Sequence, residues 1–325
     1  MTSHQIVLVA LGLAAVSSVV LGLFALYVRR MKTAVALVVA GCLGMGILTA
    51  AFILKPLLRK PYTPPELQSL FSLMSDEAVR NLQAQPKYDD PKRLTRFEAQ
   101  VFSQGGEDGT LQEIFRRIGA TNKAFCEFGA ADGVENNTAL LVMLGWGGLW
   151  MEGDDAAVAR AKVRYADAIG EGRLLVQQQF VTAENIESLL AGARLPAELD
   201  LLSIDIDCND YHVWERIANY RPRVVVIEYN STFPAGVDWV IPYDPKAVWD
   251  QRTTYFGASL SAMERLGRQK GYSLVGCSLT GVNAFFVRDD LVGDKFSGPF
   301  TAEHHYEPSR LFLISYKPGF LRNPR

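Results

Sequence analysis

The sequence is poor in the residues that build zinc fingers and disulfide frameworks. Its 325 residues include four cysteines and four histidines, and none of them shows the C-x-x-C or Cys/His spacing of a metal site. The cysteines lie in apolar contexts, which predicts reduced thiols. A large excess of one charge is also lacking: the formal net charge is −2, so nothing indicates a nucleic-acid partner.

Charged residues are absent from two long stretches near the N-terminus. Residues 6–28 and 33–54 carry none, and each is long enough to cross a bilayer as a helix. Three basic residues lie between the stretches and three follow the second one (Arg29, Arg30, Lys32, Lys55, Arg59 and Lys60). We predict two transmembrane helices in a membrane anchor over residues 1–60. Because both flanks are equally basic, charge leaves the orientation open.

Prolines recur at six positions between residues 56 and 91. We interpret residues 61–95 as a juxtamembrane connector that holds the rest of the chain away from the membrane. Pro65 suits the first turn of a helix that would continue through Leu82. Residues 96–325 are then the remaining domain.

The stretch from Ala124 to Thr138, AFCEFGAADGVENNT, combines an apolar run, a glycine-containing turn and polar residues that can begin a helix. This order is typical of the first strand–loop–helix unit of an α/β nucleotide-binding domain. Gly129 and Gly133 permit positive φ and close approach of a ligand. Glu127 ends the strand, and a buried carboxylate needs a partner. We expect that partner to be a cation or a ligand rich in donors.

The spacing of this stretch is E-x-G-x-x-x-G, which lacks the third glycine of the dinucleotide pattern G-x-G-x-x-G. It resembles instead the first motif of class I S-adenosylmethionine (SAM) methyltransferases. On that resemblance we expect several residues here to contact the cofactor: Glu127, Gly129, Asp132, Gly133, Asn137 and Thr138.

Later segments also place polar residues after apolar runs. A second strand over residues 148–152 ends at Glu152, about 20–25 residues after the loop, where nucleotide-binding α/β domains hold the ribose hydroxyls. We therefore expect Glu152 to bind ribose. Gln179 and Phe180 follow a third strand over residues 173–176, and we expect them near the adenine. Gln104, in the segment SQGGEDG before a predicted helix, is expected either to cover the cofactor or to lie in a solvated cap.

Three carboxylates fall within six residues at the end of a fourth strand predicted over residues 199–207: Asp205, Asp207 and Asp210. They would repel one another unless a cation, a donor or a shared proton intervened. Strand alternation predicts that Asp205 and Asp207 share a face, and we expect one of the three to cap the next helix. A fifth strand over residues 223–230 contains Glu228 and Asn230. The carboxyl ends of these strands predict a polar crevice.

A hairpin over residues 272–278 and 283–288 completes the expected fold. The sequence predicts an α/β, Rossmann-like, mostly parallel seven-stranded sheet with one antiparallel strand. The aromatic-rich insertion over residues 231–255 either lines an acceptor pocket or covers a sheet edge with its own small core.

Taken together, six segments resemble the FkbM-type family of class I methyltransferases: SQGGEDG (103–109), FCEFGAADGVENNTA (125–139), GWGGLWMEGD (145–154), LLSIDIDCNDYHVW (201–214), VVVIEYN (224–230) and GVNAFFVR (281–288). The resemblance implies a Rossmann-like sheet, SAM binding and, usually, O-methylation of a hydroxyl on a sugar or natural product. Cys208 is a departure, since the related pattern generally has glycine there, which puts the local loop geometry in question.

An alcohol acceptor must lose its proton during methylation. We expect Asp207 or Asp210 to orient or deprotonate the acceptor, with His212 as the other candidate base, and Asp205 to contact the cofactor. Our principal interpretation includes no metal. The alternative is a divalent ion held by Asp205 or Asp207 together with Glu228 and Asn230, which resembles the arrangement in metal-dependent O-methyltransferases.

The expected function is a membrane-anchored, SAM-dependent O-methyltransferase acting on a sugar, glycan or lipid-linked acceptor. Its catalytic domain should be cytoplasmic because SAM is a cytosolic cofactor. Two other classes remain open. A nicotinamide-dependent enzyme is disfavoured by the missing third glycine, and a non-catalytic membrane-tethered scaffold is disfavoured by the retained acids. The sequence does not indicate the oligomeric state.

Overall fold

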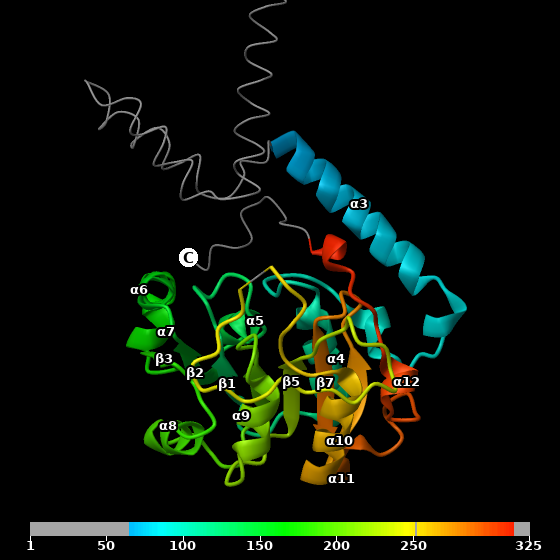
Figure 1. Cartoon of the computed structure of the whole chain (residues 1–325). Helices are drawn as coiled ribbons and strands as arrows, with labels where there is room; N and C mark the ends of the chain where they lie inside the picture. The colour runs from blue at the N-terminus through cyan, green and yellow to red at the C-terminus, as the bar shows by residue number, and fades with distance from the viewer. Residues whose placement is uncertain (1–64, 251, 315–325) are drawn as a thin grey trace, which may run out of the picture. The chain divides into compact units, whose positions relative to one another are not determined.

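The computed structural model describes residues 65–250 and 252–314 (Figure 1). Among these residues, no helix combines the length and the hydropathy needed to cross a bilayer. The two predicted transmembrane helices, residues 6–28 and 33–54, lie outside the described part of the chain and stay predictions.

Seven strands form one sheet in the order β3-β2-β1-β4-β5-β7-β6. The first five run parallel: β1 (Ala124–Phe128), β2 (Gly147–Glu152), β3 (Leu174–Gln178), β4 (Leu201–Ile204) and β5 (Val224–Glu228). β7 (Asn283–Arg288) is antiparallel to both of its neighbours, β5 and β6 (Tyr272–Cys277). The predicted mostly parallel, seven-stranded sheet with a C-terminal antiparallel pair is confirmed.

Helices cover both faces of the sheet, so its central strands are short apolar runs buried on both sides. One face packs against α8 (Ile186–Gly192), α9 (Asp210–Arg216) and α10 (Leu260–Lys270). The other packs against α4 (Glu107–Ile118), α5 (Ala139–Met143), α6 (Asp155–Arg164) and α7 (Ala166–Gly170). The sequence pattern also predicts a single helix over residues 158–169. The chain instead forms α6 and α7 around Tyr165, whose ring packs edge-on against Trp150.

The predicted connector is partly built into the fold. α3 (Pro65–Gln83) confirms the expected helix, and it is followed by the short helices η1 (Pro86–Tyr88) and η2 (Leu94–Phe97). Tyr88 and Leu94 are buried. Within the predicted connector, Tyr88 and residues 93–95 thus pack on the rest of the domain.

The C-terminal part contains α11 (Asp289–Val292), α12 (Ala302–His305) and η3 (Leu311–Leu313). Between the last two lies Glu307, which is fully buried. Its carboxylate accepts hydrogen bonds from the Tyr88 hydroxyl at 2.7 Å, from Lys87 at 2.7 Å and from Arg310 at 2.8 Å. This ion cluster joins the connector to the C-terminal segment.

The parallel strands end together at one rim of the sheet. The register aligns Phe128 with Ile204, and Ile204 with Ile227. The residues that follow β1, β4 and β5 are therefore neighbours. The chain order reverses between β1 and β4, which is where open α/β sheets bind ligands.

Candidate active site

Glu127, at the end of β1, is only 2% exposed. Its carboxylate accepts hydrogen bonds from Asn136 Nδ2 at 2.7 Å, from the Asn137 backbone N–H at 2.8 Å and from the Thr138 hydroxyl. Donors of the chain itself therefore partner the Glu127 carboxylate, and its predicted contact with a cation or cofactor stays a prediction. Glu127 holds the loop that precedes α5.

Asn137 and Thr138 belong to the same buried network. Asn137 Nδ2 donates to Ser203 Oγ at 3.0 Å. Trp150 Nε1 donates to Thr138 Oγ1 at 2.7 Å. Both side chains thus have partners within the protein, and their predicted contacts with a cofactor stay predictions.

The two glycines of the loop serve different purposes. Gly129 has φ +74°, and a Cβ at this position would lie 1.7 Å from the Asp205 carbonyl oxygen. The loop after β1 can approach the loop after β4 only because this side chain is absent. Gly133 has φ +76°, and a Cβ there would lie 2.6 Å from the Tyr165 ring. It therefore makes room for interior packing.

Glu152 ends β2 at the same rim and remains partly exposed. Its Oε2 accepts from the Ala131 backbone N–H and its Oε1 from the Asp154 backbone N–H, both at 2.8 Å. These bonds fix the carboxylate beside the loop after β1 and leave a free lone pair on each oxygen. Ala131 itself has φ +47°, an unusual conformation for a residue with a side chain.

The ring of Phe180 lies close to Gly153, the residue after Glu152. A Cβ added at Gly153 would be 3.3 Å from Phe180 Cδ2, and Phe180 is 50% exposed. The Gln179 backbone N–H donates to the Glu152 carbonyl at 2.8 Å. Glu152, which is predicted to bind ribose, therefore lies next to Gln179 and Phe180, which are predicted to lie near the adenine.

Asp132 and Gln104 are the other two residues predicted to contact the cofactor. Asp132 pairs with Arg160 at 3.2 Å and with Arg164 at 3.9 Å, both on α6. Gln104 is exposed ahead of α4. In the same segment, Glu107 accepts from the Gly105 N–H and from Asn283 Nδ2, at 2.8 and 3.0 Å.

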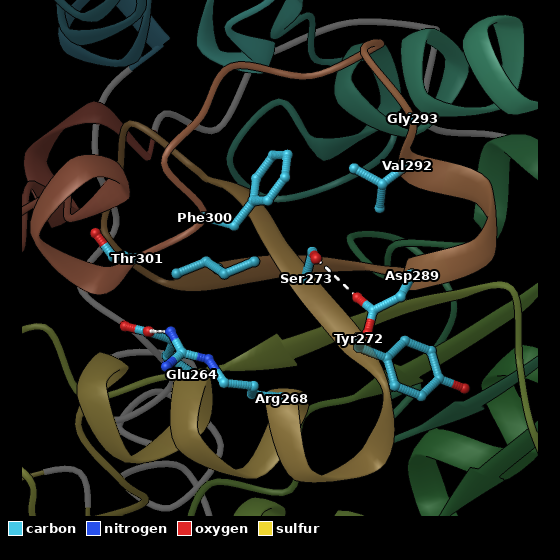
Figure 2. Close-up of a pocket in the computed structure, with 10 residues that line it drawn as sticks. Glu264, Arg268, Tyr272, Ser273, Asp289, Val292, Gly293, Phe300 and Thr301 are labelled. Atoms are coloured by element: carbon cyan, nitrogen blue, oxygen red, sulfur yellow. Dashed lines mark hydrogen bonds and ion pairs between the residues drawn. The ribbon is translucent and has the colours of Figure 1, made fainter.

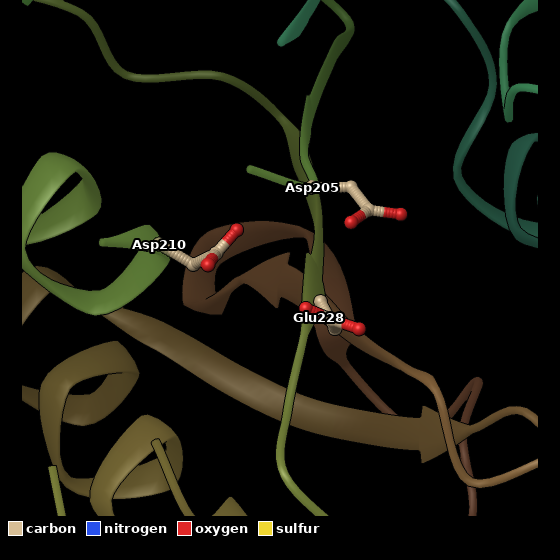
Figure 3. A group of neighbouring side chains, drawn as sticks. All are labelled: Asp205, Asp210 and Glu228. Atoms are coloured by element: carbon tan, nitrogen blue, oxygen red, sulfur yellow. The ribbon is translucent and has the colours of Figure 1, made fainter. Parts of the chain in front are cut away.

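The structure assembles an acidic trio from the residue after β4, the first residue of α9 and the last residue of β5. Asp205, Asp210 and Glu228 each offer a carboxylate oxygen, and these oxygens lie within 4.8 Å of one another (Figure 3). Asp210 is fully buried, and neither its Oδ2 nor Glu228 Oε2 has a hydrogen-bond partner among the described residues. Carboxylates are also the ligands of Mg²⁺ and related ions, so the acidic trio is the set that could hold a divalent cation.

Burial, and after it repulsion from neighbouring carboxylates, raises the pKa values of the acidic trio. Burial raises the pKa of Asp210 to about 7. The pKa values of Asp205 and Glu228 are raised well above their usual range by burial and then by the neighbouring carboxylates. Such a cluster retains a proton that ordinary carboxyl groups would lose.

The alternative metal set predicted from sequence shares Asp205 and Glu228 with the acidic trio but has Asn230 where the trio has Asp210. Asn230 donates through Nδ2 to the carbonyls of Thr254 and Phe256, at 2.8 and 2.9 Å. Its Oδ1 accepts from Thr232. The carboxamide is therefore used to fix the loop after β5, and Asp210 takes its place in the acidic trio.

Asp207 also differs from its predicted position. β4 ends at Ile204, three residues earlier than predicted, so strand alternation does not apply to Asp205 and Asp207. Asp207 has φ +68°, a conformation associated with functional loops when the residue is not glycine. Burial raises its pKa, and Glu152 adds to this by repulsion. A cysteine fits at position 208, where the related pattern generally has glycine, because the residue with positive φ is Asp207 and not Cys208.

His212 lies in the first turns of α9 but is directed to the insertion. Its Nε2 is 2.8 Å from the Ile241 carbonyl oxygen, and its ring contacts Tyr243. Because a carbonyl only accepts, Nε2 carries the proton and Nδ1 is the nitrogen left to act as a base. The role of His212 as the other candidate base stays a prediction. Asp210, two residues earlier, is directed to Asp205 and Glu228 instead.

The aromatic residues of the insertion pair mainly with one another. Phe233 stacks on Trp239 with ring centroids 4.6 Å apart, and Trp239 contacts Tyr255. Asn209 Nδ2 donates to the Asp244 carbonyl at 2.8 Å, which ties the insertion to the start of α9. These pairings agree with the small-core alternative and leave the acceptor-pocket alternative untested.

Two cavities lie away from this rim. One, of about 500 Å³, is lined by β6, α10 and α11 at the edge of the sheet. Figure 2 shows Ser273 bonded to Asp289 and Glu264 paired with Arg268 within it. The other, of about 530 Å³, lies between α4 and α5 beside Phe115 and Trp146. None of the predicted site residues lines either cavity.

No protein-family model matches this chain, and no curated protein matches it. Solved structures that match include the O-methyltransferase NcsB1 of neocarzinostatin biosynthesis in complex with S-adenosylmethionine and 2-hydroxy-5-methyl naphthoic acid. Its TM-score is 0.31 at 15% identity, covering 51% of this chain and 49% of that one. The ribosomal protein L11 methylase from Lactobacillus delbrueckii subsp. bulgaricus has a TM-score of 0.33 at 13% identity, covering 55% and 76%. The METTL16 methyltransferase domain has a TM-score of 0.35 at 12% identity, covering 56% and 66%.

The chain thus spans about half the length of the first of these structures. The strand order and the register identify the Rossmann-like α/β fold.

Proposed function

We propose that this protein is a SAM-dependent methyltransferase that methylates a hydroxyl oxygen. The observation that supports it best is the placement of Glu152 and the exposed Phe180 ring together beside the loop after β1. A nucleoside needs a carboxylate for its ribose hydroxyls and a flat apolar surface for its base. The resemblance of six sequence segments to FkbM-type methyltransferases supports the finer assignment.

The described residues fit the nucleoside half of SAM. Each Glu152 oxygen holds one backbone N–H and retains a lone pair that can accept from a ribose hydroxyl. Half of the Phe180 surface is free to stack. The acidic trio lies farther along the rim, after β4 and β5, where an acceptor can meet the cofactor.

When bound, SAM supplies a methyl group carried on a sulfonium. The part of this chain is to orient the acceptor and to accept the proton of its hydroxyl. Asp210, with a pKa of about 7, can exchange a proton near neutral pH. Burial, and after it repulsion between neighbouring carboxylates, favours proton uptake here: Asp207 raises the pKa of Asp210, and Asp210 raises those of Asp205 and Glu228.

We also propose that the enzyme is anchored in a membrane with its catalytic domain in the cytoplasm. The two uncharged stretches of spanning length support the anchor, and the cytosolic supply of SAM supports the orientation. A membrane position favours a glycan or lipid-linked acceptor among the hydroxyl compounds that the proposal allows.

Calorimetric titration of the full chain in detergent with SAM and its demethylated product tests the cofactor. We expect dissociation constants on the order of micromolar, and Glu152→Gln should weaken binding roughly tenfold, which is about 1.4 kcal/mol. Glu171→Gln is the matched control, because that carboxylate is exposed and pairs with Arg173 on the surface. Titrations with EDTA and with Mg²⁺ show whether the acidic trio uses a cation.

A folded protein that binds neither compound would refute the proposal and favour a scaffold. Binding of NADH in place of SAM would favour the nicotinamide-dependent class. Once SAM binding is established, transfer of labelled methyl groups to glycans and lipid-linked sugars identifies the acceptor.

A further inference from the structure

The first half of the long helix α3 exposes large apolar side chains. Leu70, Phe71, Leu73 and Met74 are between 48% and 59% exposed. Residues 70, 73 and 74 share one helical face by their i, i+3, i+4 spacing, and Phe71 borders it. The second half packs on the domain: Ala78, Val79 and Leu82 contact a buried cluster that includes Tyr88 and Leu313.

η3 continues this apolar surface. The Ser75 hydroxyl donates to the Leu313 carbonyl at 2.5 Å, which holds η3 against the middle of α3. Figure 1 shows the two elements side by side. The two residues just before this contact, Leu311 and Phe312, are 56% and 71% exposed. We call Leu70, Phe71, Leu73, Met74, Leu311 and Phe312 the apolar patch.

The segments that precede α3 and follow η3 are basic. Residues 55–64, which lead into α3, include Lys55, Arg59 and Lys60 and no acid. Residues 315–325, which follow η3, include three more basic residues and no acid (Lys317, Arg322 and Arg325). The whole chain has a net charge of −2. Positive charge is therefore concentrated in the segments just outside α3 and η3, whereas α3 itself carries Glu66, Asp76, Glu77 and Arg80.

A lipid surface is the occupant that matches both features. Apolar side chains on an interfacial helix enter the headgroup and acyl boundary, and neighbouring Lys and Arg bind anionic headgroups. The second uncharged stretch of spanning length ends at residue 54, and ten residues separate it from α3. Even fully extended, ten residues reach only about 35 Å. If residues 33–54 cross a bilayer, its surface therefore lies within reach of the apolar patch.

We propose that the apolar patch binds the surface of an anionic bilayer, with the first half of α3 and the exposed residues of η3 inserted at the headgroup level. The domain is then held on the membrane and not away from it by a spacer. This proposal does not depend on the enzymatic activity.

The position of the apolar patch has a consequence for the acceptor, which does rest on the proposed function. The Arg310 backbone N–H, next to η3, donates to the Thr280 carbonyl at 2.8 Å. Thr280 lies in the turn between β6 and β7, and Asn283 at the start of β7 pairs in register with Glu228. The apolar patch and the acidic trio therefore adjoin the same rim of the sheet. A hydroxyl carried on a lipid headgroup fits this arrangement.

The test uses the full chain in liposomes of phosphatidylcholine with and without phosphatidylglycerol. Single cysteines at Phe71→Cys or Phe312→Cys carry the environment-sensitive fluorophore NBD, in a Cys42→Ala background. The described native cysteines, Cys126, Cys208 and Cys277, are buried. The matched control is Val163→Cys on α6, where the native side chain is 80% exposed.

We expect the labels at 71 and 312 to emit at shorter wavelength than the label at 163. They should also be quenched by lipids that carry a nitroxide near the headgroup, more strongly with phosphatidylglycerol present. Equal exposure of all three labels to water would overturn the proposal. Shielding that persists in lipid-free amphipol would also overturn it, and would indicate a second copy if it depended on protein concentration.

Discussion

At the scale of single residues, Asp210 gives the protein a pH dependence whose sign can be worked out. Its pKa is about 7 in the folded protein, against about 3.9 in an unfolded chain. The folded state therefore binds the proton more tightly, and the resulting stabilisation is complete below about pH 4 and is lost as the pH rises through about 7.

We expect the free energy of unfolding to fall between about pH 5 and about pH 8, and Asp210→Asn to remove part of this fall. The change should be a few kcal/mol at most, and the variant should be the more stable protein at the higher pH. Urea unfolding at both pH values measures it. Asp294→Asn, at an exposed position, should behave as the native chain does. The prediction would be contradicted if the free energy of unfolding of Asp210→Asn fell with pH as steeply as that of the native chain.

Two acids at strand ends show what sequence reasoning can and cannot decide about a residue. Glu152 is the last residue of its parallel strand and Glu127 the last but one of its own, and the sequence predicted correctly that a buried Glu127 needs a partner. The identity of the partner depends on how residues 136–138 fold back over β1, which no local pattern specifies. Asp210 was recognised as a candidate base, but its grouping with Asp205 and Glu228 depends on where β4 ends.

At the scale of elements, the close approach of the loops after β1 and β4 depends on Gly129. We expect Gly129→Ala to destabilise the protein by several kcal/mol, because its Cβ would lie 1.7 Å from the Asp205 carbonyl oxygen and its φ is +74°. Gly192→Ala is the matched control: nothing lies within 4 Å of its Cβ, and within α8 alanine should stabilise by about 1 kcal/mol. Thermal unfolding compares the stability of the two variants. If Gly129→Ala were as stable as Gly192→Ala, the loops after β1 and β4 would be able to separate.

The strands could be predicted more closely than the loops and helix ends. Apolar runs bounded by glycine and polar residues placed all seven strands, because central strands of a parallel sheet are buried on both faces. The break between α6 and α7 was missed because Tyr165 stops α6 through its packing on Trp150. The end of β4 was missed because Asp205–Asp207 alternate like a strand in sequence while Asp207 turns the backbone.

At the scale of the whole molecule, the alternation of strands and helices was enough to predict a three-layer α/β fold, because parallel strands need crossover helices. The burial of the connector and the C-terminal segment was not predictable in this way. Both are held by charged and polar contacts centred on Glu307, which connect residues more than 200 positions apart. Hydrophobic periodicity contains no signal for such contacts.

Glu307 should therefore be required to hold both segments on the sheet. We expect Glu307→Ala to cost about 3–5 kcal/mol, because Arg310, Lys87 and the Tyr88 hydroxyl would lose their common partner. Glu307→Gln should cost less, since it still offers one acceptor oxygen. Glu303→Ala, an exposed neighbour on α12, is the control. Urea unfolding measures the loss, and limited proteolysis should show faster cleavage within residues 84–95. If Glu307→Ala were as stable and as resistant to cleavage as Glu303→Ala, the buried ion cluster would not be what attaches the connector, and the hydrophobic contacts of Tyr88 and Leu313 would have to do so.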